Sequence, residues 1–379
     1  MKIAVLGLIC NLKSGARAPI DLARALAKKH SVVFISYSTN QDQNTIKLLK
    51  TAGVDVRLTF QTPFPIVGKF IDLVKVRQQL MKYQPDVISA HTILTFIIAA
   101  WSTRIPLIET YYGTQFNVLG EHFMNLRRVL WLLEPFLNFL IYLKTWLIIH
   151  LPHQIIAISR FASLEAFRLY HLKCPYIYLG TDLQAVNLSK SDYRKNKSTV
   201  NLLSVSRITP YKQFELLIGM YKKLVIVYPG LKLTLVGSAP QSQYYKYLKT
   251  LDPKVQIIVS PGDAKLIKLY QQTDIYITAD KYLFLGLPII EAASFSKSAV
   301  ALNFAAAAEV IISGQTGYVA SDFSELLFFT KRLIDKPDLR RRMGIRAYQR
   351  AQHIFDWSKI ADKYIDIFTQ VIKKHVEKI

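Results

Sequence analysis

The chain has 379 residues, which is too long for one ordinary hydrophobic core and predicts two domains. Its two cysteines, Cys10 and Cys174, exclude a disulfide framework; we expect small buried hydrophobic groups in a reducing, cytoplasmic setting. A formal net charge of +23 is far from neutral and indicates an anionic partner or surface.

The first half of the chain alternates short apolar runs with helical patterns. It enters a strand pattern at once, with no cationic segment and cleavage site before it, so no signal peptide is expected. Strands are expected at 2–8, 31–36, 54–60, 86–91, 106–112 and 154–159, and helices at 18–30 and 44–51. Strands interleaved with helices favour a parallel sheet with helices on both faces.

An apolar, aromatic-rich segment occupies residues 123–152 and carries cations at Arg127, Arg128 and Lys144. Polar residues and a proline interrupt every window of roughly 18 apolar residues that a spanning helix needs. A helix lying in the membrane interface, in contact with anionic lipid, fits this pattern. Helices buried in the N-terminal domain fit it equally well, and only the net charge favours membrane contact.

The second half repeats the strand and helix alternation after a polar, charged stretch at 189–197 that is typical of a linker. Strands are expected at 200–205, 231–238, 255–260, 274–279 and 298–303, with a helix over 214–225. A last amphipathic helix is expected over 357–379, where the periodicity alone fits a helix that closes the second domain.

The strand at 200–205 runs directly into a loop that carries Arg207 and Lys212, and a helix follows. Two cations at the carboxyl end of a strand, beside the free N–H groups of a helix N-terminus, predict a pyrophosphate site. A carboxylate that opens a later helix, Glu291, can accept hydrogen bonds from a ribose. Taken alone, the two cations are equally consistent with solvated loop charges.

The order and spacing of the motifs resemble the retaining, nucleotide-sugar-dependent glycosyltransferases of family 4, which have the GT-B fold. The matching motifs lie at 2–7, 14–16, 85–91, 110–114, 155–159, 178–182, 206–212, 233–238, 274–277, 286–292, 309–311 and 355–357. The resemblance covers nearly the whole chain and implies two Rossmann-like domains facing each other across a cleft. The acceptor-side domain would be 1–188 and the nucleotide-sugar domain 189–356, with helix 357–379 crossing back to the first.

The resemblance also implies roles for residues of the second domain. Arg207 and Lys212 would neutralise the charge on the departing diphosphate. Glu291 would anchor the ribose, and the backbone at Gly286 and Leu287 would support the donor, because a glycine permits close approach.

The resemblance to family 4 also implies two further contacts with the donor and a reaction that needs no metal ion. Gly15 would let the main chain of the first domain approach the diphosphate, and Glu309 is retained from another donor-site motif. The sequence has no Asp-x-Asp motif and no close cluster of histidines, so no metal site is expected. The donor would be a UDP- or GDP-sugar, with no other cofactor.

His91 and Tyr112 stand at strand ends beside the expected cleft, and both are candidate catalytic residues. The family has a histidine at each position. A phenol can donate a hydrogen bond but is a poor base near neutral pH, because its ordinary pKa is about 10. His91 is equally consistent with a buried histidine whose hydrogen bonds are satisfied inside the domain.

The chain departs from the family in the motif that should read the donor sugar. Leu283 stands where a glutamate is expected, and Ala305 and Ala306 replace a pair of glycines. A leucine cannot accept hydrogen bonds from sugar hydroxyls. The donor sugar is therefore held differently, or the site has lost selectivity or activity; otherwise Leu283 is a core residue.

The function that these patterns favour is transfer of a sugar to a lipid-linked or cell-surface glycan acceptor by a cytoplasmic protein, peripheral on the inner membrane face. A catalytically weak binding subunit of a glycan-assembly complex is one alternative, motivated by Leu283. A nucleic-acid-binding protein is another, although the cations are spread along the chain and no reading motif occurs, so no nucleic-acid partner is expected. An NAD-linked oxidoreductase lacks its Gly-x-Gly-x-x-Gly motif.

Overall fold

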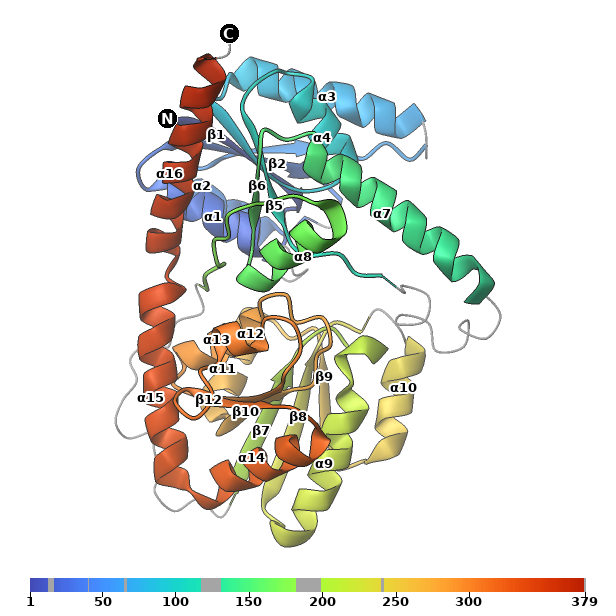
Figure 1. The fold of residues 1–379 in the computed structure, drawn as a ribbon, viewed down its shortest axis with the longest axis vertical. Coiled ribbons are helices and arrows are strands. Elements are labelled where there is room, and N and C mark those ends of the chain that lie inside the picture. The colour runs from blue at the N-terminus through green and yellow to red at the C-terminus, as the bar shows by residue number, and fades with distance from the viewer. Residues whose placement is uncertain are drawn as a thin grey trace. The chain divides into compact units, whose positions relative to one another are not determined.

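The structure, a computed structural model, describes residues 1–12, 17–39, 41–64, 67–116, 131–181, 199–239 and 242–377. The chain forms two compact units, whose elements are labelled in Figure 1. The first comprises Met1–Thr114, Phe139–Gly180 and Trp357–Ile379, and the second comprises Gln115–Asn138 and Thr181–Asp356. Each contains a six-stranded parallel sheet with helices, which confirms the expectation of two Rossmann-like domains.

The sheet of the first unit has the strand order β3-β2-β1-β4-β5-β6. Its strands are β1 (Lys2–Ile9), β2 (Ser31–Tyr37), β3 (Asp55–Thr59), β4 (Val87–His91), β5 (Leu107–Tyr111) and β6 (Gln154–Ala157). Its helices are α1 (Arg17–Ala27), α2 (Gln43–Thr51), α3 (Val67–Tyr83), α4 (Leu94–Trp101), α7 (Glu134–His150, in this unit from Phe139), α8 (Arg160–Tyr170) and α16 (Trp357–Val376). The strand order reverses between β1 and β4, where Gly7 pairs with His91.

The strands of the first unit are apolar runs because helices cover both faces of the sheet. β4 and β5 are buried along their whole length. Local signals set the helix starts: the Asp42 carboxylate accepts from the backbone N–H of Thr45 at the start of α2, and the Ser159 hydroxyl accepts from that of Ala162 at the start of α8.

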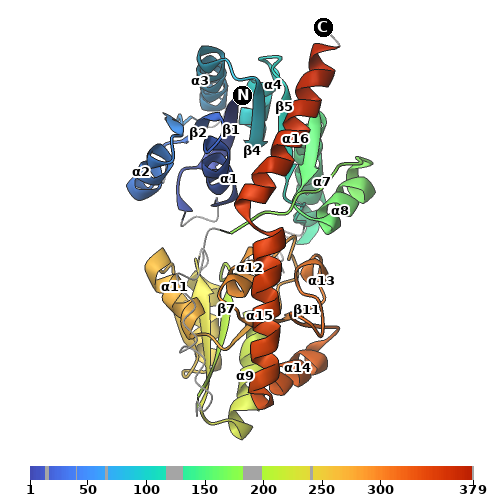
Figure 2. The same cartoon turned by 90° about the vertical axis from the view of Figure 1, so that its left-hand side faces the viewer.

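The terminal helix α16 belongs to the first unit. It packs against α1, as Figure 2 shows. Its Tyr364 is fully buried, and the Tyr364 hydroxyl lies 3.2 Å from the Thr110 hydroxyl on β5. The apolar stripe recognised in the sequence therefore covers the first sheet and not the second.

The sheet of the second unit has the order β12-β11-β10-β7-β8-β9. Its strands are β7 (Val200–Val205), β8 (Leu231–Gly237), β9 (Gln256–Val259), β10 (Ile275–Thr278), β11 (Ser298–Leu302) and β12 (Gly317–Ala320). Its helices are α9 (Phe214–Val227), α10 (Ser242–Leu251), α11 (Asp263–Gln272), α12 (Leu287–Ser294), α13 (Ala307–Val310), α14 (Phe323–Asp335) and α15 (Pro337–Ile354). The strand β7 lies inside the sheet between β10 and β8, so its carboxyl end is a topological switch point.

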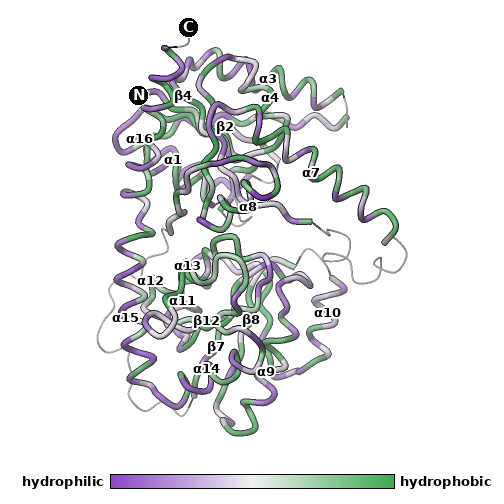
Figure 3. The backbone as a smooth tube through the Cα atoms, viewed as in Figure 1, coloured by the Kyte–Doolittle hydropathy of each residue, from purple (hydrophilic) through white to green (hydrophobic). Residues whose placement is uncertain are grey.

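Helix α7 covers the described part of the aromatic-rich segment, and residues 123–130 lie outside the described ranges, as does the expected linker at 189–197. Phe136, Phe139 and Trp146 are 59%, 57% and 39% exposed, and Ile149 is the one buried residue of the helix. The green stretches of α7 in Figure 3 mark this apolar character. None of the helices in the described part of the chain has the length and apolar character that crossing a bilayer requires.

Candidate functional site

The loop after β7 is held against the end of β8 by its backbone. The N–H of Ser206 donates to the carbonyl of Val236 at 2.9 Å, and the N–H of Ile208 donates to that of Ser238 at 2.7 Å. A Cβ at Gly237 would lie 1.7 Å from the carbonyl oxygen of Ser206, so no other residue fits there without moving the loop. The neighbouring strand thus fixes where the cations of the loop stand.

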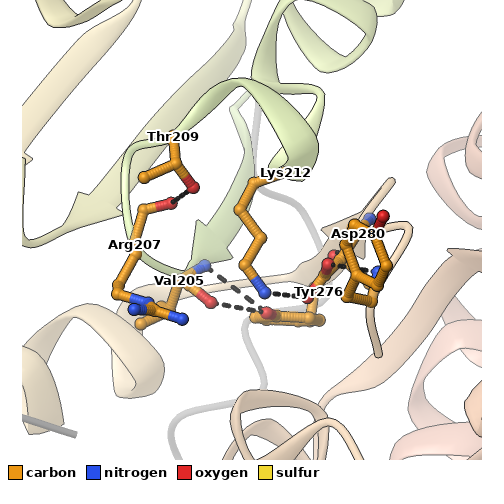
Figure 4. A network of polar contacts seen from close by, with 8 residues as sticks. Val205, Arg207, Thr209, Lys212, Tyr276 and Asp280 are labelled. Atoms are coloured by element: carbon orange, nitrogen blue, oxygen red, sulfur yellow. Dashed lines mark hydrogen bonds and ion pairs between the residues drawn. The ribbon is translucent and has the colours of Figure 1, made fainter. Parts of the chain in front are cut away.

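The structure brings Arg207 and Lys212 together, as the sequence predicted, on one aromatic ring. The Arg207 guanidinium lies 5.9 Å and the Lys212 ammonium 4.9 Å from the ring centroid of Tyr211. Arg207 is exposed, whereas the side chain of Lys212 is only 11% exposed. Figure 4 shows both side chains projecting from the loop after β7. One cation is therefore open to an incoming anion, and the other is held within the unit.

Lys212 forms an ion pair with Asp280, a residue that the sequence reasoning did not use. Asp280 follows β10, is 6% exposed, and also accepts from the backbone N–H of Tyr282 at 2.9 Å. Burial lowers the pKa of Lys212, and the Asp280 carboxylate opposes this effect. The two residues meet because β7 and β10 are neighbours in the parallel sheet, so that their carboxyl ends lie at one edge.

The sequence placed the start of a helix at Glu291, but α12 begins earlier, at Leu287. Gly286 is its N-cap with φ at +85°, a conformation that favours glycine, and Leu287 is its first residue. Glu291 therefore lies one turn inside α12 and does not open the helix. It is 8% exposed and accepts a 2.6 Å hydrogen bond from the Tyr270 hydroxyl, so its carboxylate already has a protein partner.

Leu283 is 5% exposed, and its side chain packs near Gly286: a Cβ built on Gly286 would lie 3.1 Å from the Leu283 Cγ. Its carbonyl accepts from the N–H of Ala306 at 3.0 Å. These contacts favour the interpretation of Leu283 as a core residue. The preceding Ala305 has φ at +51°, so an alanine takes a left-handed conformation where the family has glycine.

Glu309 lies in the short helix α13 and is half-buried. Its carbonyl accepts from the Arg350 guanidinium at 2.7 Å, which ties α13 to α15. Gly15 lies outside the described residues. Among the described residues, no group of three histidine, cysteine, aspartate or glutamate side chains is placed to hold a metal ion.

His91 and Tyr112 meet in the first unit, at the carboxyl ends of β4 and β5. The His91 Nδ1 lies 2.9 Å from the Tyr112 hydroxyl, and its Nε2 lies 3.2 Å from the Ser89 hydroxyl. Burial lowers the pKa of His91 to about 3 and raises the pKa of Tyr112 well above its ordinary value. Both side chains are therefore neutral near pH 7, and His91 fits the description of a buried histidine with satisfied hydrogen bonds.

A buried acid lies close to this pair and was also not recognised from the sequence. Glu109, on β5, is 3% exposed and accepts from the backbone N–H of Thr92. Burial raises its pKa well above the ordinary value, which favours the neutral carboxylic acid. The sequence did not identify Glu109 as a site residue, because a single glutamate inside an apolar strand forms no recognisable motif.

Known proteins resemble the chain along most of its length. Two family models match adjacent parts, Glycosyltransferase Family 4 over residues 16–185 and Glycosyl transferases group 1 over residues 187–350. The N-acetyl-alpha-D-glucosaminyl L-malate synthase of Bacillus anthracis is 22% identical over 318 residues, which are 79% of this chain and 78% of that protein.

Solved structures share the fold at lower identity. HepE of Anabaena, in complex with UDP-glucose, superposes with a TM-score of 0.76 at 20% identity, covering 98% of this chain and 100% of that chain. The sucrose-phosphate synthase of Thermosynechococcus elongatus superposes with a TM-score of 0.76 at 18% identity, covering 99% and 100%.

Proposed function

The chain belongs to the glycosyltransferases of family 4 and group 1 with the GT-B fold, and on that premise we propose that it uses a UDP- or GDP-sugar as donor. The observation that carries the proposal is the pairing of Arg207 and Lys212 on Tyr211, at the carboxyl end of a central strand. A diphosphate placed there meets two cations in a partly buried setting, where charge-assisted hydrogen bonds are strong.

The proposed reaction breaks the bond between the sugar anomeric carbon and the diphosphate oxygen, and joins that carbon to an acceptor oxygen. The diphosphate departs with the bonding electron pair, and the acceptor hydroxyl gives up its proton to the departing diphosphate. Arg207 and Lys212 would stabilise the negative charge that develops on the departing oxygen, a task that needs no metal ion. Retention at the anomeric carbon and independence of metals are part of the proposal.

Nucleoside and sugar contacts are proposed for the neighbouring helix. Glu291 would accept from the ribose hydroxyls by exchanging or sharing its bond with Tyr270. The N–H groups of Gly286 and Leu287 stand at the start of α12 and would support the donor phosphate or sugar. Glu309 and Gly15 are further proposed donor contacts, and His91 and Tyr112 are proposed to orient the reacting sugar as neutral hydrogen-bonding groups.

The acceptor is proposed to be a lipid-linked or cell-surface glycan, reached by a cytoplasmic protein that is peripheral on the membrane. Support comes from α7, whose aromatic side chains are exposed, and from the net charge of +23. Contact with anionic lipid through residues 123–152 would hold the protein near such an acceptor.

Leu283, which stands where the family has a glutamate, motivates a second candidate function, a binding subunit with little or no catalysis. Thermal stabilisation by a panel of nucleoside diphosphates and nucleotide sugars tests the donor proposal. A ligand at roughly 100 times its dissociation constant adds about 2.7 kcal/mol to the stability. Stabilisation by UDP or GDP supports the donor site, and stabilisation by none of the panel would remove it. Hydrolysis of the binding nucleotide sugar then distinguishes an enzyme from a binding subunit.

A further inference from the structure

A second exposed apolar surface lies on the first unit, at helix α3 and the loop before it. Its six side chains are Phe60 (69% exposed), Phe64 (66%), Val67 (64%), Phe70 (70%), Ile71 (39%) and Val74 (40%). The four members on α3 stand at positions i, i+3, i+4 and i+7 and so share one face of the helix. We call these six residues the α3 surface. Several large exposed apolar side chains on one helix face and on the loop before it are typical of an interaction site.

The outward direction of the α3 surface is built into the packing of α3. The buried Asp72 carboxylate accepts from the N–H and hydroxyl of Thr62, at 3.1 and 2.7 Å, and from the Tyr37 hydroxyl at 3.1 Å. A Cβ at Gly68 would lie 2.8 Å from the Thr62 carbonyl, so the loop crosses the helix closely. Val76 and Leu80 lie on the same side of α3 as Asp72 and pack in the hydrophobic core of the first unit. The apolar face is therefore held away from the core.

The charges around the α3 surface indicate what covers it. Among the residues of α3, the cations Lys69, Arg77 and Lys82 are exposed, whereas the single acid, Asp72, is buried. Aromatic and aliphatic side chains flanked by exposed lysine and arginine are typical of helices that lie in an anionic membrane interface. The net charge of the chain, +23, is also positive, so long-range electrostatic forces attract the protein to an anionic membrane surface.

Figure 1 shows the N-terminal end of α3 and helix α7 projecting from the same side of the first unit. In Figure 3 both carry hydrophobic stretches there. From the exposure, the spacing and the flanking cations, we propose that the α3 surface inserts into the headgroup region of an anionic bilayer and is a second membrane contact beside α7. The proposal deepens the proposed function, because it rests on a membrane-bound acceptor.

Vesicle flotation tests the α3 surface directly. The triple variant Phe60→Ser/Phe64→Ser/Phe70→Ser is compared with Phe328→Ser, which removes a phenylalanine that is 56% exposed on α14 of the second unit. Vesicles contain phosphatidylglycerol with phosphatidylcholine, or phosphatidylcholine alone. The parent and Phe328→Ser should float with the anionic vesicles, and the triple variant should bind at least tenfold more weakly. Equal binding by the triple variant, or binding by the parent that ignores lipid charge, would overturn the proposal.

A second measurement holds even if the triple variant folds poorly. Phe70→Trp and Phe328→Trp place a new indole on each surface, and vesicles with brominated acyl chains quench an indole that enters the bilayer. Additional quenching relative to the parent is expected for Phe70→Trp and not for Phe328→Trp; equal quenching contradicts the proposal. Stabilisation by UDP or GDP, measured on the same samples, reports on the proposed donor site. If the parent floats with the vesicles but is not stabilised by UDP or GDP, the donor proposal is wrong. If it is stabilised by the nucleotide but does not float, the proposal for the α3 surface is wrong.

Discussion

Lys212 and Asp280 form an ion pair that joins the loop after β7 to the end of β10. Both side chains are largely buried, so each depends on the other for its charge. If a diphosphate binds at Lys212, it competes with Asp280 for the same ammonium group. The Asp280 carboxylate therefore already neutralises one of the two cations of the site, Lys212. We expect an incoming diphosphate to meet the exposed Arg207 first.

Asp280→Asn should destabilise the protein by about 3 kcal/mol, because it leaves a largely buried lysine without its counter-charge. A diphosphate supplies the missing negative charge. UDP or GDP should therefore stabilise Asp280→Asn more than it stabilises the parent. Urea unfolding with and without the nucleotide measures both effects.

The double variant Lys212→Met/Asp280→Asn is the control for this prediction. It removes both charges and should recover much of the lost stability while responding weakly to nucleotide. An equal nucleotide response in the parent and in Asp280→Asn would show that the diphosphate does not reach Lys212.

Arg207→Ala and Lys212→Ala should each weaken nucleoside diphosphate binding by roughly 1.5–3 kcal/mol, the range for a charge-assisted hydrogen bond. Titration calorimetry measures the loss. Lys281→Ala, a nearby exposed cation, should bind as the parent does and controls for net charge. If both site variants bind UDP and GDP with parental affinity, the diphosphate assignment is wrong.

Leu283→Glu should lower the melting temperature, because it puts a carboxyl group at a position that is 5% exposed and packed near Gly286. Even as a neutral acid, an unpartnered buried polar group destabilises by roughly 1–3 kcal/mol. Leu283→Met, which conserves volume, should change the stability far less. A stable Leu283→Glu protein with altered use of nucleotide sugars would instead place position 283 in the donor pocket.

Ala305→Gly should leave the stability unchanged or raise it by up to about 1 kcal/mol, since Ala305 has a φ of +51° and glycine adopts it freely. The adjacent Ala306 has a φ of −90° and is the matched control. Ala306→Gly should destabilise by roughly 0.5–1 kcal/mol, because glycine only adds flexibility to the unfolded chain there. Equal effects at the two positions would contradict the left-handed turn.

The buried His91 should make stability depend on pH in a defined window. Its pKa is 6.5 when unfolded and about 3 in the folded protein, so only the unfolded state takes up a proton below pH 6.5. Its contribution is complete above this pH and declines as the pH falls towards 3. About 1 kcal/mol should be lost between pH 6.5 and about pH 5.5.

His91→Gln should remove this part of the pH dependence, measured as urea midpoints across the window. His353→Gln, at an exposed position of α15, should keep the parental slope. A parental slope in His91→Gln would show that His91 titrates equally in both states.

The sequence predicted the alternation of strands and helices because buried parallel strands are short apolar runs, and Val200–Val205 agrees residue for residue with β7. Helix α3 was not recognised. Its outward side chains at Val67, Phe70 and Val74 are apolar like its buried ones, so the contrast between its faces is weak. Hydrophobic periodicity detects a helix that has one buried apolar face and one polar face in solvent. It fails where the exposed face is apolar as well.

Site residues carried by a local motif were predicted, whereas those set by tertiary contacts were not. Arg207 and Lys212 share one loop and lie near the same ring, so their closeness follows from their closeness in the sequence. Asp280 is far along the chain, and its pairing with Lys212 depends on the neighbouring positions of β7 and β10 in the sheet. The hydrogen bond from Tyr270 to Glu291 and the burial of Glu109 depend likewise on packing that no sequence spacing encodes.

Release of nucleoside diphosphate from a panel of UDP- and GDP-sugars, followed by NMR on the purified chain, tests the central claim most directly. We predict release from at least one nucleotide sugar, with the anomeric configuration of the first sugar product retained. Release should be lost in Arg207→Ala and Lys212→Ala and kept in Lys281→Ala. Binding of a nucleotide sugar without release from any member of the panel would contradict the transferase and leave the binding subunit. Release that persists in both site variants would contradict the assigned site.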